Sequence, residues 1–219
     1  NKRDKASILE AVNTQLEGGI HDLNKVVIAL LRKWLTEQVE QLTAYTPNGE
    51  QSFSVQDQRG VFLRSQGRFA EAANVYRQIL QEKNEKAVDD EETLFAMLRL
   101  SQTLWSQGKL DEAETLSRQC VSGYLRTKGT TYFYTLAAIH NLATVLKDRG
   151  KLSEAETLFR KALAGCKATE GEEGPSTLST MNSLAEVLID RGQLEEAESL
   201  HRKTLALRQT LLGESHPHS

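Results

Sequence analysis

A nine-residue phrase occurs four times in this 219-residue chain and constrains the fold more than any other feature. It reads GRFAEAANV from Gly67, GKLDEAETL from Gly108, GKLSEAETL from Gly150 and GQLEEAESL from Gly192. Its glycines lie 41, 42 and 42 residues apart. Self-similarity at a period of roughly 20–50 residues is the signature of a solenoid, in which each unit packs on its neighbours. The sequence therefore predicts a repeat protein without a single central core.

Each repeat is predicted to be a pair of antiparallel helices joined at the phrase's glycine, because apolar residues recur at helical spacing on both sides of it. Glycine suits the left-handed backbone that closes a helix end. The leucine four residues before the glycine faces the alanine five residues after it, and that small side chain lets the two helices approach closely. Four repeats are expected within residues 51–215, at about 52–83, 91–126, 131–167 and 175–212.

The two ends of the chain depart from the phrase. Residues 1–50 are predicted to form a helical cap, or the tail of an upstream domain, and carry a wide apolar stripe that includes Trp34. That stripe either packs against the first repeat or forms a coiled-coil or dimer face. Residues 216–219 resemble the start of a fifth repeat, since Pro217 follows Pro175 by 42 residues. We therefore expect the last repeat to expose an apolar face that needs a partner, a neighbour or more chain.

The order of small residue, leucine, glycine, leucine or phenylalanine, and alanine resembles the tetratricopeptide repeat. The period near 42, NLATVLKDRGKLSEAETLFRKAL from Asn141 and LALRQTLLGESHP from Leu205 are similar to the kinesin-light-chain and nephrocystin-3 subtype. HEAT and armadillo repeats have a similar period but lack the glycine-to-alanine phrase. The resemblance implies an all-α, right-handed α-solenoid with an N-terminal helical cap. It also implies a concave groove, lined by the first helix of each pair, that holds a peptide.

The helical register selects the residues expected to face this groove. The candidates are Asp57, Arg64, Leu98, Gln102, Trp105, His140, Thr144, Lys147, Asn182 and Glu186. Trp105 is the best single anchor, because tryptophan is enriched at the centres of binding sites. Its alternative role is packing against the first helix of the third repeat.

Composition and motifs favour a binding protein over an enzyme. The net charge of −3 gives no general attraction to nucleic acid or anionic membranes, and no apolar run is long enough to span a bilayer. We find no nucleotide-binding, hydrolase or metalloprotease motif, and expect no cofactor, metal or catalytic residue. His216 and His218 belong to the repeat linker, and Tyr132, Phe133 and Tyr134 are expected to pack in the core or linker. Cys120 and Cys166 are expected to be reduced thiols, which favours the cytoplasm or another reducing compartment.

The sequence thus predicts a non-catalytic scaffold or adaptor that binds a protein or peptide in its groove. The alternative is a structural subunit of a large assembly, held by its end caps and convex surfaces. That assembly would form through the N-terminal helices or the exposed last repeat. A third possibility is the non-catalytic arm of an enzyme.

Overall fold

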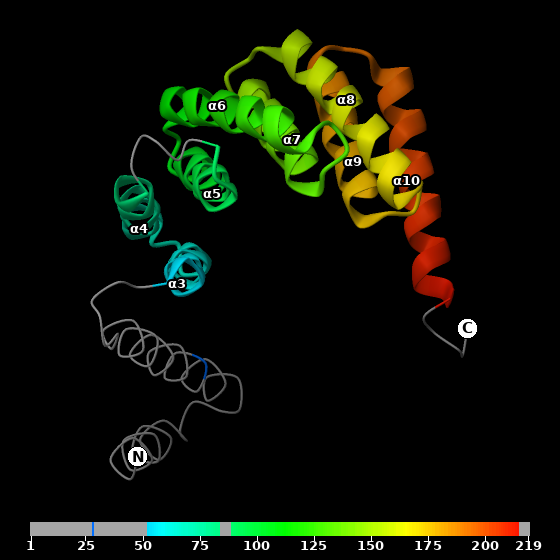
Figure 1. The fold of residues 1–219 in the computed structure, drawn as a ribbon. Coiled ribbons are helices and arrows are strands. Elements are labelled where there is room, and N and C mark those ends of the chain that lie inside the picture. The colour runs from blue at the N-terminus through cyan, green and yellow to red at the C-terminus, as the bar shows by residue number, and fades with distance from the viewer. Residues whose placement is uncertain (1–27, 29–51, 84–88, 215–219) are drawn as a thin grey trace, which may run out of the picture. The chain divides into compact units, whose positions relative to one another are not determined.

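The computed structural model describes residues 28, 52–83 and 89–214, and the regular elements in these ranges are α-helices without strands (Figure 1). The helices are α3 (Phe53–Ser65), α4 (Phe69–Glu82), α5 (Glu91–Ser106), α6 (Leu110–Lys128), α7 (Phe133–Asp148), α8 (Leu152–Glu170), α9 (Pro175–Asp190) and α10 (Leu194–Glu214). The chain divides into two compact units, Asn1–Arg59 and Gly60–Ser219. The cap predicted for residues 1–50, except Ile28, and the fifth-repeat start at 216–219 lie outside the described residues.

The phrase's glycine ends the first helix of each pair with a left-handed turn, as predicted. Gly67, Gly108, Gly150 and Gly192 have φ angles between 73° and 76°. In the third pair, the amide of Gly150 donates to the carbonyl of Lys147 over 2.8 Å, and that of Lys151 donates to Leu146 over 2.9 Å. These bonds satisfy carbonyls at the helix end, so three residues suffice to turn the chain.

The core of the second unit runs through consecutive helix pairs. One apolar cluster contains buried residues of α5, α6, α7, α8, α9 and α10. Ala155 of the phrase has no exposed surface, and neither has Leu146, four residues before its glycine. The second unit is therefore an all-α solenoid in which successive layers bury one another, as the repeat period predicts.

The helix ends differ from the predicted ones by up to three residues. The largest difference is in the second helices, since α8 continues to Glu170 whereas the third repeat is expected to end at about residue 167. The Thr169 hydroxyl donates to the Gly165 carbonyl over 3.1 Å, and Gly171, with φ of 79°, ends the helix. Polar residues can extend a helix on its solvent side, so charge alone does not mark the loop.

In the ranges that the structure covers, no helix combines the length and the apolar character needed to cross a bilayer.

Cys120 and Cys166 are both free and buried. The Cys120 thiol donates to the Leu94 carbonyl over 3.3 Å, and burial raises the pKa of this thiol to about 12. Cys120 is therefore protonated and unreactive at neutral pH.

Candidate functional site

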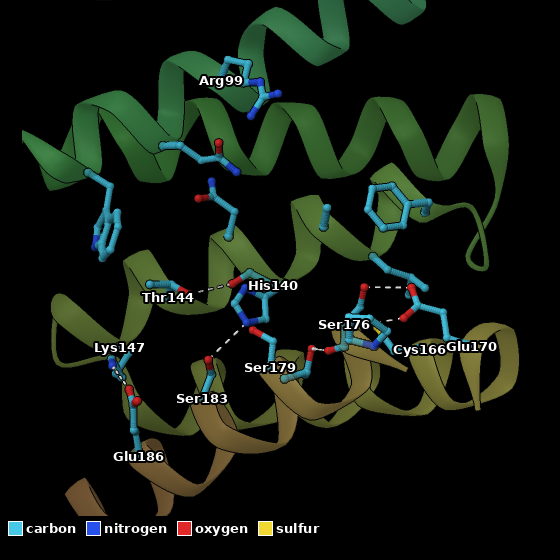
Figure 2. A pocket seen from close by; sticks show the side chains of 18 of the residues that line it. Arg99, His140, Thr144, Lys147, Cys166, Glu170, Ser176, Ser179, Ser183 and Glu186 are labelled. Carbon is cyan, nitrogen blue, oxygen red and sulfur yellow. Dashed lines mark hydrogen bonds and ion pairs between the residues drawn. The ribbon is translucent and has the colours of Figure 1, made fainter. Parts of the chain in front are cut away.

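A groove of about 760 Å³ lies along the first helices of consecutive pairs in the second unit. Its walls come mainly from α5, α7 and α9, with Cys166 and Glu170 contributed by α8 (Figure 2). Seven of the ten residues predicted from the register border it. They are Arg64, Gln102, Trp105, His140, Thr144, Lys147 and Glu186.

The repeat period explains why these side chains come together. Gln102, Thr144 and Glu186 are 42 residues apart and occupy one position on successive first helices. Trp105 and Lys147 share a second position, one helical turn further along. Because successive layers stack in the same orientation, each position becomes a row of side chains across the groove.

Three of the predicted residues do not line the groove. Leu98 is only 3% exposed and lies in the apolar core, so its predicted groove position is wrong. Its position on the helix points between helices, although the equivalent His140, which is half-buried, lines the groove. Asn182, at the same position in the fourth pair, is half-buried outside the lining. Asp57 is half-buried in α3 and belongs to the Asn1–Arg59 unit.

Trp105 combines both roles that the sequence leaves open. Its side chain borders the groove and the residue is 36% exposed. Its indole Nε1 donates to Oδ2 of Asp148, the last residue of α7, over 2.6 Å. The hydrogen bond fixes the ring against the neighbouring layer while leaving part of it open to a ligand. A fixed, partly exposed aromatic ring loses little freedom on binding.

Polar pairs connect the helices along the groove. Lys147 Nζ lies 2.7 Å from Glu186 Oε2, joining α7 to α9. Arg64 Nη1 donates to Gln102 Oε1 over 3.1 Å, joining α3 to α5. These pairs set the positions of long side chains that would otherwise be mobile, so the walls are preorganised for hydrogen bonding.

The imidazole of His140, which lines the groove, is neutral at physiological pH. His140 Nε2 lies 3.2 Å from Ser183 Oγ, and its ring packs edge-on against Phe159 with 5.1 Å between centroids. Burial lowers the pKa of His140, and the nearby positive charge of Lys147 acts in the same direction against the opposing effect of Glu186. A neutral imidazole offers one donor and one acceptor.

The sequence reasoning missed a serine row on α9. Ser176, Ser179 and Ser183 line the groove and are labelled along one helix in Figure 2. Ser176 Oγ donates to Glu170 Oε1 over 2.8 Å. The spacing of three and four residues within PSTLSTMNS was the available signal, since it places all three on one helix face.

Phe133 is a second missed groove residue. It borders the groove and is 56% exposed, and its ring packs edge-on against Tyr134. Tyr132 and Tyr134 pack against the core cluster, as predicted for this aromatic segment, so Phe133 is the exception. The groove thus has exposed aromatic rings from α5 and α7, with hydrogen-bonding groups on several walls.

The lining combines hydrogen-bonding groups, charged groups and aromatic rings. The described ranges contain no group of three His, Cys, Asp or Glu residues suited to a metal ion. Cys166 lines the groove but is 3% exposed, and burial raises its pKa, so its thiol is a poor nucleophile. The groove's chemistry is hydrogen bonding, ion pairing and aromatic contact.

Comparison with known proteins identifies the repeat. The tetratricopeptide repeat family model matches residues 51–126 and 134–217, which is more than half of the chain. A search of curated proteins finds no match.

Several solved structures share the fold. A variant of a putative kinesin light chain from Podosopora anserina, with nearly identical TPR-like repeats, is 21% identical with a TM-score of 0.68, covering 96% of each chain. BtubC (BKLC) from P. vanneervenii is 21% identical with a TM-score of 0.63, covering 99% of this chain and 75% of its own. A MamA RS-1 double mutant is 14% identical with a TM-score of 0.61, covering 86% of this chain and 93% of its own. Likeness at these identities concerns the fold.

Proposed function

Because this chain belongs to the tetratricopeptide repeat family, in its kinesin light chain-like form, we propose that it is an adaptor that binds a peptide segment of a partner protein. Repeats of this family act generally as protein–protein interaction scaffolds and are typically non-catalytic. The proposed binding site is the groove along α5, α7 and α9. The observation that carries the proposal is Trp105, which is held by Asp148 and still partly exposed at the groove.

The repetition of the lining supports an elongated ligand. Packed helices are about 8–10 Å apart, and an extended peptide advances about 3.3 Å per residue. Equivalent side chains on successive first helices, such as Gln102, Thr144 and Glu186, would therefore meet about every third residue of an extended peptide. A volume of about 760 Å³ alone would also suit a small molecule, so the repeated rows favour the peptide.

The lining also favours a ligand with aromatic or apolar side chains and hydrogen-bonding groups. Trp105 and Phe133 supply exposed rings, while the serines of α9 and neutral His140 supply uncharged polar groups. The opposite charges of Lys147 and Glu186 neutralise each other, since Lys147 Nζ lies 2.7 Å from Glu186 Oε2. We place the protein in a reducing compartment such as the cytoplasm, a proposal supported by the free, buried thiols of Cys120 and Cys166.

The binding role can be tested with a phage-displayed library of random peptides selected on the full chain. Peptides that bind should lose about 30-fold in affinity with Trp105→Ala, because truncating a central tryptophan costs about 2 kcal/mol or more. Calorimetry measures the affinity, and a circular dichroism melt checks that the fold is kept.

The matched control is Gln119→Ala, an exposed position on α6 outside the groove, which should leave the affinity unchanged. Equal binding by Trp105→Ala and the unmodified chain would remove Trp105 from the site. Selected peptides that bind equally well after both Trp105→Ala and Phe133→Ala would contradict the groove as the binding surface.

A further inference from the structure

The groove carries an acidic residue, Glu170, that the repeat does not explain. It lines the groove from the last position of α8, and the equivalent residue of α6, 42 positions earlier, is Lys128. Within the described ranges, no lysine or arginine pairs with Glu170. The layer that contains α8 and α9 therefore presents a negative charge to the groove where the preceding layer has a positive one.

Hydrogen bonds hold the Glu170 carboxylate in place at the start of α9. Its Oε2 accepts from the Ser176 amide over 3.1 Å, and its Oε1 accepts from the Ser176 hydroxyl over 2.8 Å (Figure 2). The carboxylate thereby caps α9, where Gly174 at the N-cap position has no side chain to do so. A carboxylate offers about four lone-pair sites, so these two bonds leave others. Because Glu170 is exposed, the remaining sites are open to a donor on a ligand.

The nearby lysines bind a different carboxylate. Lys167 Nζ lies 3.3 Å from Glu172 Oε1, and Lys203 Nζ lies 2.7 Å from Glu172 Oε2. Glu173, in the same turn, is exposed and has no cation partner among the described residues. The three glutamates and two lysines of this cluster leave a net charge of −1. This end of the groove therefore favours a cation over an anion.

The cations that line the groove act at other places. Lys147 is paired with Glu186 of α9. Arg64 and Arg99 come from α3 and α5. Packed helices are about 8–10 Å apart, so the axis of α5 lies about two such steps from that of α9. Charges are screened over about 8 Å at physiological salt, so these arginines and Glu170 act on different parts of an extended ligand.

Phe133 lies at the same end of the groove as Glu170. Leu136 of α7 packs against Gly165 of α8 so closely that a β carbon on Gly165 would overlap its side chain. Phe133 precedes Leu136 by three residues, and Glu170 follows Gly165 by five. Since α7 and α8 form an antiparallel pair, both residues lie about one turn beyond this contact on the same side. An exposed ring and a fixed carboxylate thus border one part of the groove.

We propose that this part of the groove binds a lysine or arginine side chain of the peptide. A long basic side chain fits both features, because its apolar stem packs on the Phe133 ring while its charged head pairs with Glu170. Ser179, exposed in the groove one turn after Ser176, supplies a further hydroxyl acceptor. The inference rests on the proposed peptide-binding role and adds the chemistry of one ligand residue.

Peptides selected from a random phage-displayed library on the unmodified full chain are the probe. They should share a lysine or arginine, and Glu170→Gln should lower their affinity about fivefold in calorimetry, as expected for a partly exposed ion pair. Glutamine keeps an oxygen acceptor for the Ser176 amide, so a circular dichroism melt should show the fold retained. Glu170→Lys should lower the affinity at least about tenfold by placing like charges together.

A charge exchange tests whether Glu170 and the basic residue pair directly. A synthetic peptide with glutamate in place of that residue should bind the Glu170→Lys chain more tightly than it binds the unmodified chain. The matched control is Glu195→Lys, which changes the net charge equally. Glu195 is exposed on α10, outside the groove and without a cation partner in the part of the chain that the structure describes. This control should change the affinity of the basic peptide by less than about twofold.

The outcomes separate this inference from the peptide-binding role itself. Peptides that need Trp105 but share no basic residue sensitive to Glu170→Gln would overturn the inference and leave the groove as the binding site. Equal binding of the glutamate peptide to the unmodified and Glu170→Lys chains would refute direct pairing. Equal effects of Glu170→Lys and Glu195→Lys would reduce the preference to the net charge of the chain and overturn the inference. A library that yields no binding peptide would overturn the peptide-binding role and this inference with it.

Discussion

Gly60 shows how a single residue adapts one helix pair of a repeated architecture. It occupies the position that holds Ser101, Ala143 and Ala185 in the other three pairs. The sequence explains a small residue there but not the absence of any side chain. A β carbon on Gly60 would lie 2.4 Å from Cζ of Tyr76, whose ring on α4 is fully buried. The large ring fills the space that a side chain takes in the other pairs.

Gly60→Ala should therefore destabilise the protein although alanine is the better helix former. Overpacking a core costs about 1–3 kcal/mol, whereas alanine gains about 1 kcal/mol over glycine in a helix. We expect a net loss of about 1 kcal/mol in the free energy of unfolding, measured by urea denaturation. Val61→Ala, at a neighbouring position that is 41% exposed, should change it by less than about 0.5 kcal/mol. A Gly60→Ala protein more stable than the unmodified chain would show that Tyr76 moves freely.

At the candidate site, the repeat period accounts for some residue positions and not for others. The row of Gln102, Thr144 and Glu186 follows from the 42-residue period, because equivalent positions in stacked layers lie side by side. Leu98 lies in the core instead of the groove, because helical periodicity gives the direction of a side chain but not how deeply the next helix covers it. Phe133, at the first position of α7, depends on where that helix begins, which periodicity sets least well.

At the scale of elements, ion pairs connect the second helix of each pair to that of the next. An arginine ten residues after one phrase glycine reaches a glutamate four residues after the next. The pairs are Arg77–Glu112, Arg118–Glu154 and Arg160–Glu196, each at 2.8 Å. These are exposed pairs of small individual effect, so their repetition sets the register between layers more than it adds stability.

Glu114 is a buried carboxylate that binds one of these arginines, Arg118. Its side chain is 8% exposed, and Lys151 Nζ and Arg118 Nη2 lie 2.8 and 2.9 Å from its Oε1. Burial acts to raise the pKa of Glu114, but hydrogen bonds from Lys151 and Arg118 and the charge of Arg149 outweigh it. The pKa therefore falls from 4.5 to about 2. One carboxylate thus joins α6 to the turn between α7 and α8.

The pH dependence of stability should report this carboxylate. A depressed pKa in the folded state stabilises the protein above the unfolded value of 4.5 and loses that effect as the pH falls toward 2. Glu114→Gln should lower the free energy of unfolding by about 2 kcal/mol at pH 7, as expected for hydrogen bonds to a charged group. The difference from the unmodified chain should shrink between about pH 5 and 2, measured by urea denaturation at each pH.

Glu154→Gln is the control for this prediction, because Glu154 also binds Arg118 but is 43% exposed. Its effect at pH 7 should stay below about 0.5 kcal/mol. Equal effects of the two substitutions at pH 7 would show that burial of Glu114 adds nothing. A Glu114→Gln deficit that persists unchanged at pH 2 would contradict the electrostatic origin.

At the scale of the molecule, the helix pairs and their order follow from the phrase, because its glycines stop the first helices and its alanines pair the helices. The phrase does not predict how many neighbouring helices each layer packs against. In the second unit α7 packs against α5, α6, α8 and α9, whereas α10 packs mainly against α9. Since a solenoid is stabilised by nearest-neighbour contacts, a layer covered on two sides should open less often than one covered on a single side.

Amide hydrogen exchange followed by mass spectrometry should show this gradient. Amides of α7 should exchange at least about tenfold more slowly than those of α10, after correction for sequence-dependent intrinsic rates. A tenfold difference corresponds to about 1.4 kcal/mol in opening free energy, well within the cost of exposing one apolar layer. Arg160→Ala and Glu196→Ala, which break the exposed pair between α8 and α10, should leave the gradient in place. Uniform protection from α5 to α10 would mean that these helices open together as one cooperative unit, and would contradict stabilisation by neighbouring layers.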